Sequence, residues 1–162
     1  MNSVKLIFSI ASMALLASCN SCKNSKQATA TSTNTGATVN NPWLGETKWV
    51  FENYTKNPVA HLTTKPSLNF ETVDEKTVSY SGKSFVNNYS GTLTVIKNVI
   101  TKKYEGMSTQ MASADDNLNK LEYTYFQNIN KIAQYKIDGN KLMLICVNEN
   151  NEVVEEMIFT KG

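Results

Sequence analysis

Short runs of alternating apolar and polar residues fill most of the chain beyond residue 47. In the run 47–54, for example, Trp49 and Phe51 lie on one face. Similar runs follow at 67–71, 77–81, 85–96, 99–104, 134–137, 141–147 and 153–160. A period of two, interrupted by Gly, Pro, Asn and Asp, is typical of antiparallel strands with one buried face, so we expect about eight strands. Gly82 is expected to break the run at 77–81, and Asp-Gly at 138–139 predicts a tight hairpin.

One segment, from Asp115 to Lys131, has the spacing of a helix instead. Its apolar positions, three or four residues apart, are Leu118, Leu121, Tyr125, Ile129 and Ile132. Ser113 or Asp115 can cap its start. The sequence therefore predicts a mainly β (α+β) fold, in which one helix precedes the last three strands. A curled antiparallel sheet or small barrel of about eight strands, plugged by the helix, would leave few exposed strand edges.

The N-terminal residues 1–18 have the organisation of a signal peptide. Lys5 supplies a positive charge, the apolar stretch 6–16 follows, and Leu16-Ala17-Ser18-Cys19 has the form of a lipobox. We expect lipid to be attached to Cys19, because the residues before Cys22 form a poor lipobox. The alternative is an ordinary cleaved signal followed by a coincidental cysteine. Two or more acyl chains on Cys19 would give stable anchoring without a membrane span.

The residues between the lipid site and the first strand predict a tether. Ser, Thr, Asn, Ala and Lys dominate the segment, which has almost no large apolar side chain to bury. We therefore divide the chain into a signal (1–18), a lipidated cysteine with a disordered tether (19–41) and one domain (42–162). Asn20, with no acidic run after it, favours the outer membrane, facing the periplasm of a bacterial envelope.

Charge and cysteine content restrict the possible partners. The chain has 16 basic and 14 acidic residues, and every basic residue is a lysine. This balance gives no basic footprint for nucleic acid, and arginine, the residue best suited to phosphate recognition, is absent. The expected partners are the membrane, through the lipid, and an envelope protein. Cys146 alternates with buried positions, which predicts an inert thiol rather than a disulfide to Cys22.

Several segments, in order, resemble the META domain that is shared with the HslJ heat-shock lipoproteins. They are Thr47-Lys-Trp49, Pro66–Phe70, Val78–Thr92, Met107–Ser113, the helix with Glu122 and Phe126, and Tyr135–Leu144. The resemblance covers 45–161 and implies a similar barrel. It also implies an association with envelope stress and antibiotic tolerance, without a settled enzymatic activity. Many relatives have Gly-Cys-Asn at Phe85-Val86-Asn87 and Met-Ala-Cys at Met111-Ala112-Ser113. The chemistry of that cysteine pair is therefore lost here.

The polar residues most suited to a binding cleft are Asn87, Asn88, Tyr89 and Thr109. Polar groups beside glycines at a bend in a sheet can line a cleft, but they can equally satisfy buried backbone groups at a strand crossing. The second interpretation is favoured, and Asn87 and Thr109 are the strongest candidates if a site exists.

No other residue pattern points to catalysis. His61 lies in a Thr-rich loop without metal-ligand or triad motifs, which predicts a solvated side chain. Glu122 is expected to pair with a lysine, and one of Glu155 and Glu156 needs a partner or a bulge. We expect no cofactor beyond the lipid, no metal and no enzymatic activity. The function predicted is binding, or an envelope-stress role; the alternative is a barrel that binds a small apolar ligand.

Overall fold

The computed structural model describes residues 47–162, without the side chains of 102–105. The signal peptide predicted at 1–18, Cys19 and the tether predicted up to residue 41 lie outside the described residues. Among the described residues, no helix is both long enough and apolar enough to cross a membrane.

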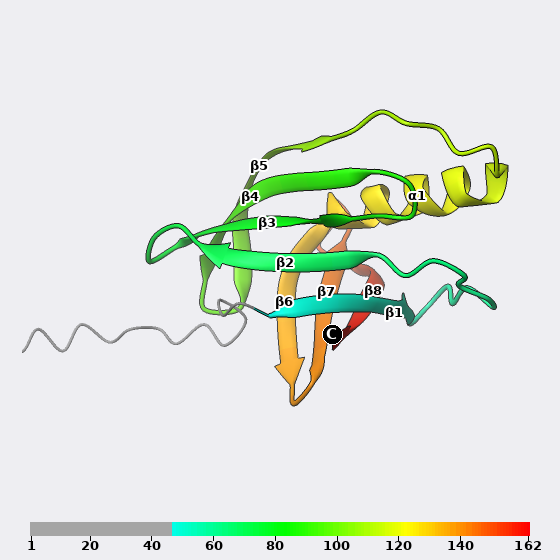
Figure 1. The fold of residues 1–162 in the computed structure, drawn as a ribbon. Coiled ribbons are helices and arrows are strands. Elements are labelled where there is room, and N and C mark those ends of the chain that lie inside the picture. The colour runs from blue at the N-terminus through cyan, green and yellow to red at the C-terminus, as the bar shows by residue number, and fades with distance from the viewer. Residues whose placement is uncertain (1–46) are drawn as a thin grey trace, which may run out of the picture. The chain divides into compact units, whose positions relative to one another are not determined.

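Eight antiparallel strands form a closed barrel in which each strand pairs with its neighbours in sequence, and β8 pairs with β1 (Figure 1). The strands are β1 (Lys48–Tyr54), β2 (Ser67–Thr72), β3 (Thr77–Lys83), β4 (Asn88–Ile96), β5 (Val99–Ser108), β6 (Ile132–Asp138), β7 (Lys141–Val147) and β8 (Val153–Lys161). The helix α1 (Asp116–Ile129) lies between β5 and β6 in the sequence. The predicted fold class, with one helix before the last three strands, is confirmed.

Alternate side chains of the strands fill the barrel. Phe51, on β1, lies at the centre of this core, where it makes edge-to-face contacts with the rings of Tyr54, Phe85, Tyr125 and Phe159. Ring pairs of this kind add about 0.5–1.5 kcal/mol each beyond the area they bury. Tyr125 comes from α1 and is fully buried, so the helix contributes directly to the barrel interior.

Several predicted boundaries were wrong, among them the start of the run at 85–96, because β4 begins at Asn88. Gly82 lies within β3, because its lack of a Cβ leaves room for the carbonyl oxygen of Ser67 on β2. Ile132 belongs to β6, since α1 ends at Ile129 and Asn130 caps it. The fifth strand continues beyond the predicted run to Ser108. The helix start was correct: the side chain of Asp115 accepts a hydrogen bond from the Asn117 amide.

The barrel is weakly joined between β5 and β6. Strand β4 pairs with β5 along most of its length, from the pair formed by Ile96 and Val99 to the pair formed by Tyr89 and Ser108. The register of β5 with β6, in contrast, consists of Val99 and Gln134 alone. Beyond that point β5 runs along the top of Figure 1, away from β6, and α1 occupies the space between them. Among the described residues, the outer edge of β5 from Thr101 onward therefore has no strand partner.

Candidate functional site

A buried carboxylate on α1 holds the loop between β3 and β4. Glu122 is 6% exposed, and its Oε1 accepts hydrogen bonds from the hydroxyl of Ser84 and from the backbone amide of Asn87, at 2.8 Å for the amide. Its Oε2 accepts a further bond from Asn87 Nδ2 at 2.9 Å. The expected lysine partner of Glu122 was wrong: the loop supplies neutral donors instead. These bonds pin α1 against the loop.

Asn87 is the centre of this network. Its Nδ2 also donates to the carbonyl of Met111 at 2.9 Å, and its Oδ1 accepts from Thr109 Oγ1 at 2.7 Å and from the Met111 amide at 2.8 Å. Both polar atoms of the side chain are thus fully used, and Asn87 itself is buried. The structure brings Asn87 and Thr109 together, as a clamp between two loops.

The other two residues of the predicted cleft lie at the surface side of the clamp. Asn88, Tyr89 and Thr109 line an open depression of about 540 Å³ on the outside of the sheet. Asn69, Ser81, Gly82, Ser90, Met107 and Ser108 complete it. The lining is rich in hydroxyls and amides and contains no charged side chain. Three of the four predicted residues therefore share one surface, while Asn87 supports it from beneath; a binding role for them stays a prediction.

The hydroxyl of Tyr89 is buried and already hydrogen-bonded, so it is not free to bind a ligand. It donates to the carbonyl of Ser67 at 2.9 Å and lies 2.7 Å from the hydroxyl of Tyr125. A carbonyl cannot donate, so Tyr89 gives its proton to Ser67 and accepts one from Tyr125. Burial raises the pKa of both tyrosines, so both hydroxyls stay protonated.

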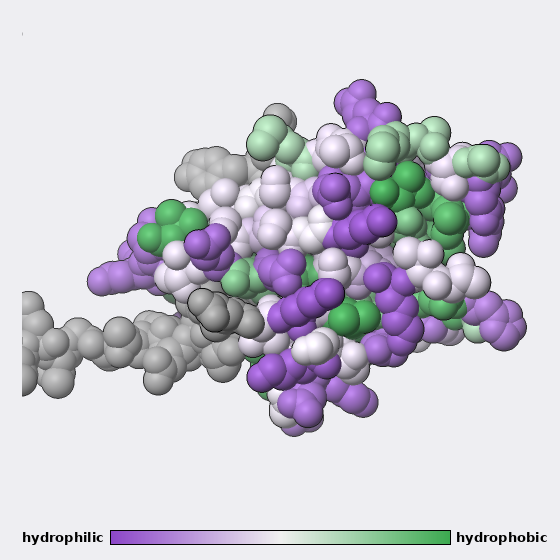
Figure 2. Space-filling view, viewed as in Figure 1, coloured by the Kyte–Doolittle hydropathy of each residue, from purple (hydrophilic) through white to green (hydrophobic). Residues whose placement is uncertain are grey.

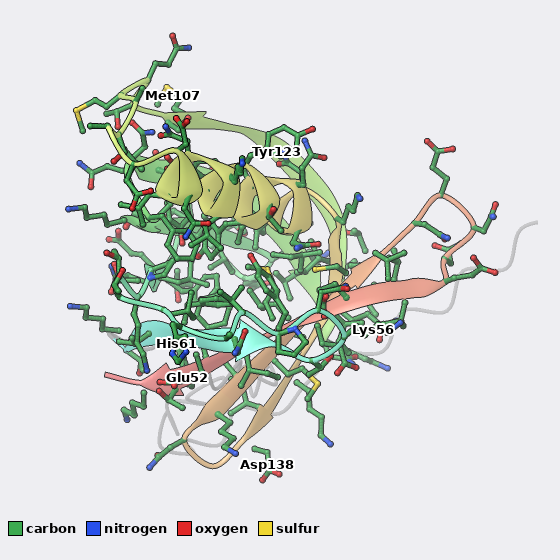
Figure 3. The ribbon with its side chains drawn as sticks, turned by 90° about the vertical axis from the view of Figure 1, so that its right-hand side faces the viewer. Glu52, Lys56, His61, Met107, Tyr123 and Asp138 are labelled. Atoms are coloured by element: carbon green, nitrogen blue, oxygen red, sulfur yellow. The ribbon has the colours of Figure 1, made fainter. Side chains whose placement is uncertain are left out.

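A second hollow, which we call the seam slot, lies between β5 and α1. It encloses about 210 Å³ and shares part of its lining with the open depression. Its lining residues are Tyr80, Tyr89, Ser90, Gly106, Met107, Ser108, Phe126, Ile129 and Asn130. In Figure 3, Met107 lies above α1 and Tyr123 lies on the helix itself. The slot thus combines hydroxyls with apolar side chains, beside the unpaired edge of β5.

One hydroxyl that borders the seam slot belongs to a mostly buried side chain. This is the hydroxyl of Tyr80, whose side chain is 7% exposed. A Cβ at Gly91 or Gly106 would collide with it, so the two glycines leave the space it occupies. Burial raises the pKa of Tyr80, which keeps the hydroxyl protonated and able to donate. A ligand in the slot could therefore accept a hydrogen bond from this hydroxyl.

One cavity inside the barrel is much smaller than the seam slot. The cavity enclosed by Leu68, Phe70, Tyr80, Leu93, Ile129, Ile132 and Leu144 has a volume of about 10 Å³. That is about the size needed for one water molecule. An apolar ligand bound by the barrel stays a prediction, and this interior cavity has room for no more than about one water molecule.

The remaining candidates have structural environments. His61 is exposed in the loop between β1 and β2, as predicted (Figure 3). Cys146 is fully buried, and its thiol donates to the carbonyl of Asn128 at 3.3 Å. Glu155 is buried and accepts hydrogen bonds from the backbone amide of Lys56 and the side-chain amide of Asn57. These donors are the partners that the sequence analysis expected for one of Glu155 and Glu156. Among the described residues, no group of three His, Cys, Asp or Glu side chains could hold a metal ion.

Comparison with known proteins identifies the family. The model of the META domain matches residues 42–157, and the chain therefore belongs to the META domain family. It is similar to a protein solved by NMR at 22% identity, with a TM-score of 0.53 over 74% of this chain and 92% of that one. A second NMR structure, of a protein from Burkholderia xenovorans, is 18% identical, with a TM-score of 0.52 over 78% and 87%. At these identities the likeness concerns the fold. No curated protein matches the sequence.

Sequence reasoning missed two residues of the site. Ser84 gave no signal, because its partner Glu122 lies 38 positions away and the contact exists only after folding. Tyr80 was recognised as a strand residue, but the sequence did not place its hydroxyl at a hollow between β5 and α1. The glycines at 91 and 106 were the available signal, since a glycine within a strand often marks a close approach by a neighbouring group.

Proposed function

We propose that this META domain protein is lipid-anchored in the bacterial envelope and acts by binding an extended segment of an envelope protein, not by catalysis. The anchor rests on the lipobox that ends at Cys19. The observation that carries the binding role is the seam slot, a hollow lined by hydroxyl and apolar side chains beside the unpaired edge of β5.

An extended polypeptide suits this place for two reasons. A strand edge presents alternating backbone donors and acceptors, and another strand satisfies them all at once. The slot below the edge would accept one side chain of the added segment against Phe126 and Ile129. Because the lining has no charged residue, the inserted side chain would be uncharged, with a polar group within reach of Tyr80.

A catalytic role has weaker support. The polar residues with the most suggestive chemistry, Ser84, Asn87 and Glu122, are all buried and hydrogen-bonded to one another. A substrate would have to displace those bonds, and the loss of each would cost about 1–3 kcal/mol.

Photo-crosslinking in intact membranes tests the proposal. A photoreactive residue at position 107, where Met107 is 76% exposed at the rim of the slot, should capture one partner through an extended segment. The same residue at position 153, where Val153 is exposed at the start of β8, is the control and should not. A synthetic peptide of the captured segment should slow amide exchange at Gly106 and Ser108.

The variant Tyr80→Phe makes the test specific. It removes only the hydroxyl that borders the slot, so the fold should keep its stability while peptide affinity falls by about two- to tenfold, the effect of one hydrogen bond. Capture equal at 107 and 153, or binding unaffected by both Tyr80→Phe and Met107→Lys, would contradict the proposed site.

A further inference from the structure

Three features of the domain meet at one end of the barrel. Lys48, which begins β1, pairs with Asn69 in the middle of β2, and because the two strands are antiparallel, β1 starts on the side toward which β2 runs. The turn between β2 and β3 is next to the turn between β4 and β5, because the amide of Val95 donates to the carbonyl of Lys76 at 2.7 Å. Both turns lie at the left in Figure 1, on the side from which β1 starts. We call this end, formed by Lys48, residues 73–76 and residues 96–99, the entry end.

Large apolar side chains are exposed at the tips of the entry end. Val73 is 61% exposed, Ile96 is 48% exposed and Val99 is 40% exposed. In Figure 2, a hydrophobic tip surrounded by hydrophilic residues protrudes at the left, where Figure 1 shows the turn between β2 and β3. Turn tips are usually polar, so exposed apolar side chains on two adjacent turns indicate an interaction surface for a protein or a membrane.

The charges around these tips are mixed. Lys48, Lys76 and Lys97 are exposed, but Asp74 and Glu75 lie in the same turn as Lys76. The Asp74 carboxylate is already bonded to the amides of Lys76 and Thr77, both at 2.8 Å. The entry end is therefore not a basic patch. Its distinguishing property is apolar tips flanked by lysines, the combination found where proteins touch a lipid interface.

We propose that the entry end rests on the lipid surface, with Val73 and Ile96 in the interface. This inference rests on the proposed lipid anchor. The described chain begins at Thr47 at this end, and only residues 20–46 separate it from Cys19. A tether of this length keeps the entry end at high effective concentration near the bilayer, so a few weak apolar contacts suffice to orient the domain. The slot-bearing edge of β5 and the start of α1 would then face away from the anchor.

The test uses the mature lipidated protein in vesicles of phosphatidylethanolamine and phosphatidylglycerol, with a paramagnetic lipid headgroup that broadens nearby amide signals. We expect broadening at residues 74–76 and 96–98, and none at residues 148–152 in the turn between β7 and β8. The double variant V73S/I96S should reduce broadening at the entry end to the level of 148–152. The matched control Val153→Ser, which removes an exposed valine at the opposite end, should leave the pattern unchanged.

The outcomes separate this inference from the proposed anchor. Protein that fails to float with the vesicles would overturn the anchor and the orientation together. Alternatively, the protein floats with the vesicles and shows equal broadening of amide signals at both ends, or broadening that V73S/I96S does not change. Either result would leave the anchor in place and overturn the orientation. Protection of these turns in native membranes but not in lipid vesicles would assign the surface to a protein and overturn the lipid contact.

Discussion

Glu122 on α1 and Asn87 in the loop between β3 and β4 are joined by two hydrogen bonds, one from the backbone amide at 2.8 Å and one from the side-chain amide at 2.9 Å. The same Asn87 side chain holds Thr109 and Met111 in the segment that leads to the helix. One asparagine thus connects three parts of the chain. Asn87 and Thr109, the strongest candidates for a binding site in the sequence, thus have a structural role: they hold the surface of the depression in place.

Exchanging the amide for a carboxylate at position 87 should be costly. Asn87→Asp places a second acid against Glu122 and removes the donor to the Met111 carbonyl, so we expect the free energy of unfolding to fall by about 2–4 kcal/mol. Adding Glu122→Gln restores an amide–carboxylate pair and should recover part of this loss. Urea denaturation of the two single variants and the double variant measures the coupling.

The neighbouring residue provides the control for this cycle. Asn88 is exposed, so Asn88→Asp should change stability by no more than about 0.5 kcal/mol. Additive effects of the two changes at 87 and 122 would show that these side chains are not coupled, which would contradict the recovery expected for the double variant.

The alternation of side chains predicted most of the barrel, because the period of two is a property of each strand by itself. The helix was predicted for a similar reason, because the spacing of three or four residues between its apolar positions, from Leu118 to Ile129, is also a property of that segment alone. The partners of Glu122 could not be predicted, since loop donors and lysines are equally compatible with a lone acid on a helix. The seam slot was also beyond prediction, because it depends on where β5 leaves β6, and the pattern of side chains does not show that point.

Gly82 should be intolerant of any side chain. A Cβ at this position would overlap the backbone carbonyl of Ser67, which is also the acceptor for the Tyr89 hydroxyl. Gly82→Ala must therefore separate β2 from β3 locally, and we expect a loss of about 1–3 kcal/mol. Thermal unfolding checks this value.

Gly139→Ala serves as the comparison. Gly139 has a φ of +56°, but nothing lies within 4 Å of a Cβ placed there. Only backbone strain of about 1 kcal/mol is expected. A cost at Gly82 no greater than that at Gly139 would argue against the close approach of Ser67.

Glu155 should make stability depend on pH in the acid range. Burial raises the pKa of its carboxyl, but hydrogen bonds from Lys56, Glu156 and Asn57 outweigh this, so the pKa lies below the usual 4.5. A lowered pKa in the folded state means that the ionised form stabilises the fold above about pH 4.5, and that this contribution is lost as the pH falls through the folded value. Glu155→Gln should therefore lower stability at neutral pH and flatten its decline in acid.

Urea denaturation across pH 3 to 7 measures how the free energy of unfolding depends on pH. The difference between the unaltered protein and Glu155→Gln should be on the order of the effects of other paired carboxylates. Glu149→Gln, at an exposed position in the turn between β7 and β8, is the control and should run parallel to the unaltered protein. If the Glu155→Gln curve ran parallel as well, the hydrogen bonds to the loop would contribute nothing measurable.

Cys146 should be unreactive until the domain unfolds. Its side chain is fully buried and its thiol contacts the Asn128 carbonyl. In a protein with Cys19→Ala and Cys22→Ser, a thiol reagent should label Cys146 only in denaturant, at a rate that follows global unfolding. Rapid labelling of the native protein, with no denaturant present, would show that β7 opens locally.

The intact mass of the protein extracted from membranes, compared with Cys19→Ala, tests the central claim most directly. The account predicts a native mass equal to residues 19–162 plus acyl chains, and an unlipidated or uncleaved form for the variant. A native protein that carries no acyl chain and is cut at another position would contradict it. The META domain would then be a secreted barrel, and both the anchoring and the membrane-facing entry end would have to be abandoned.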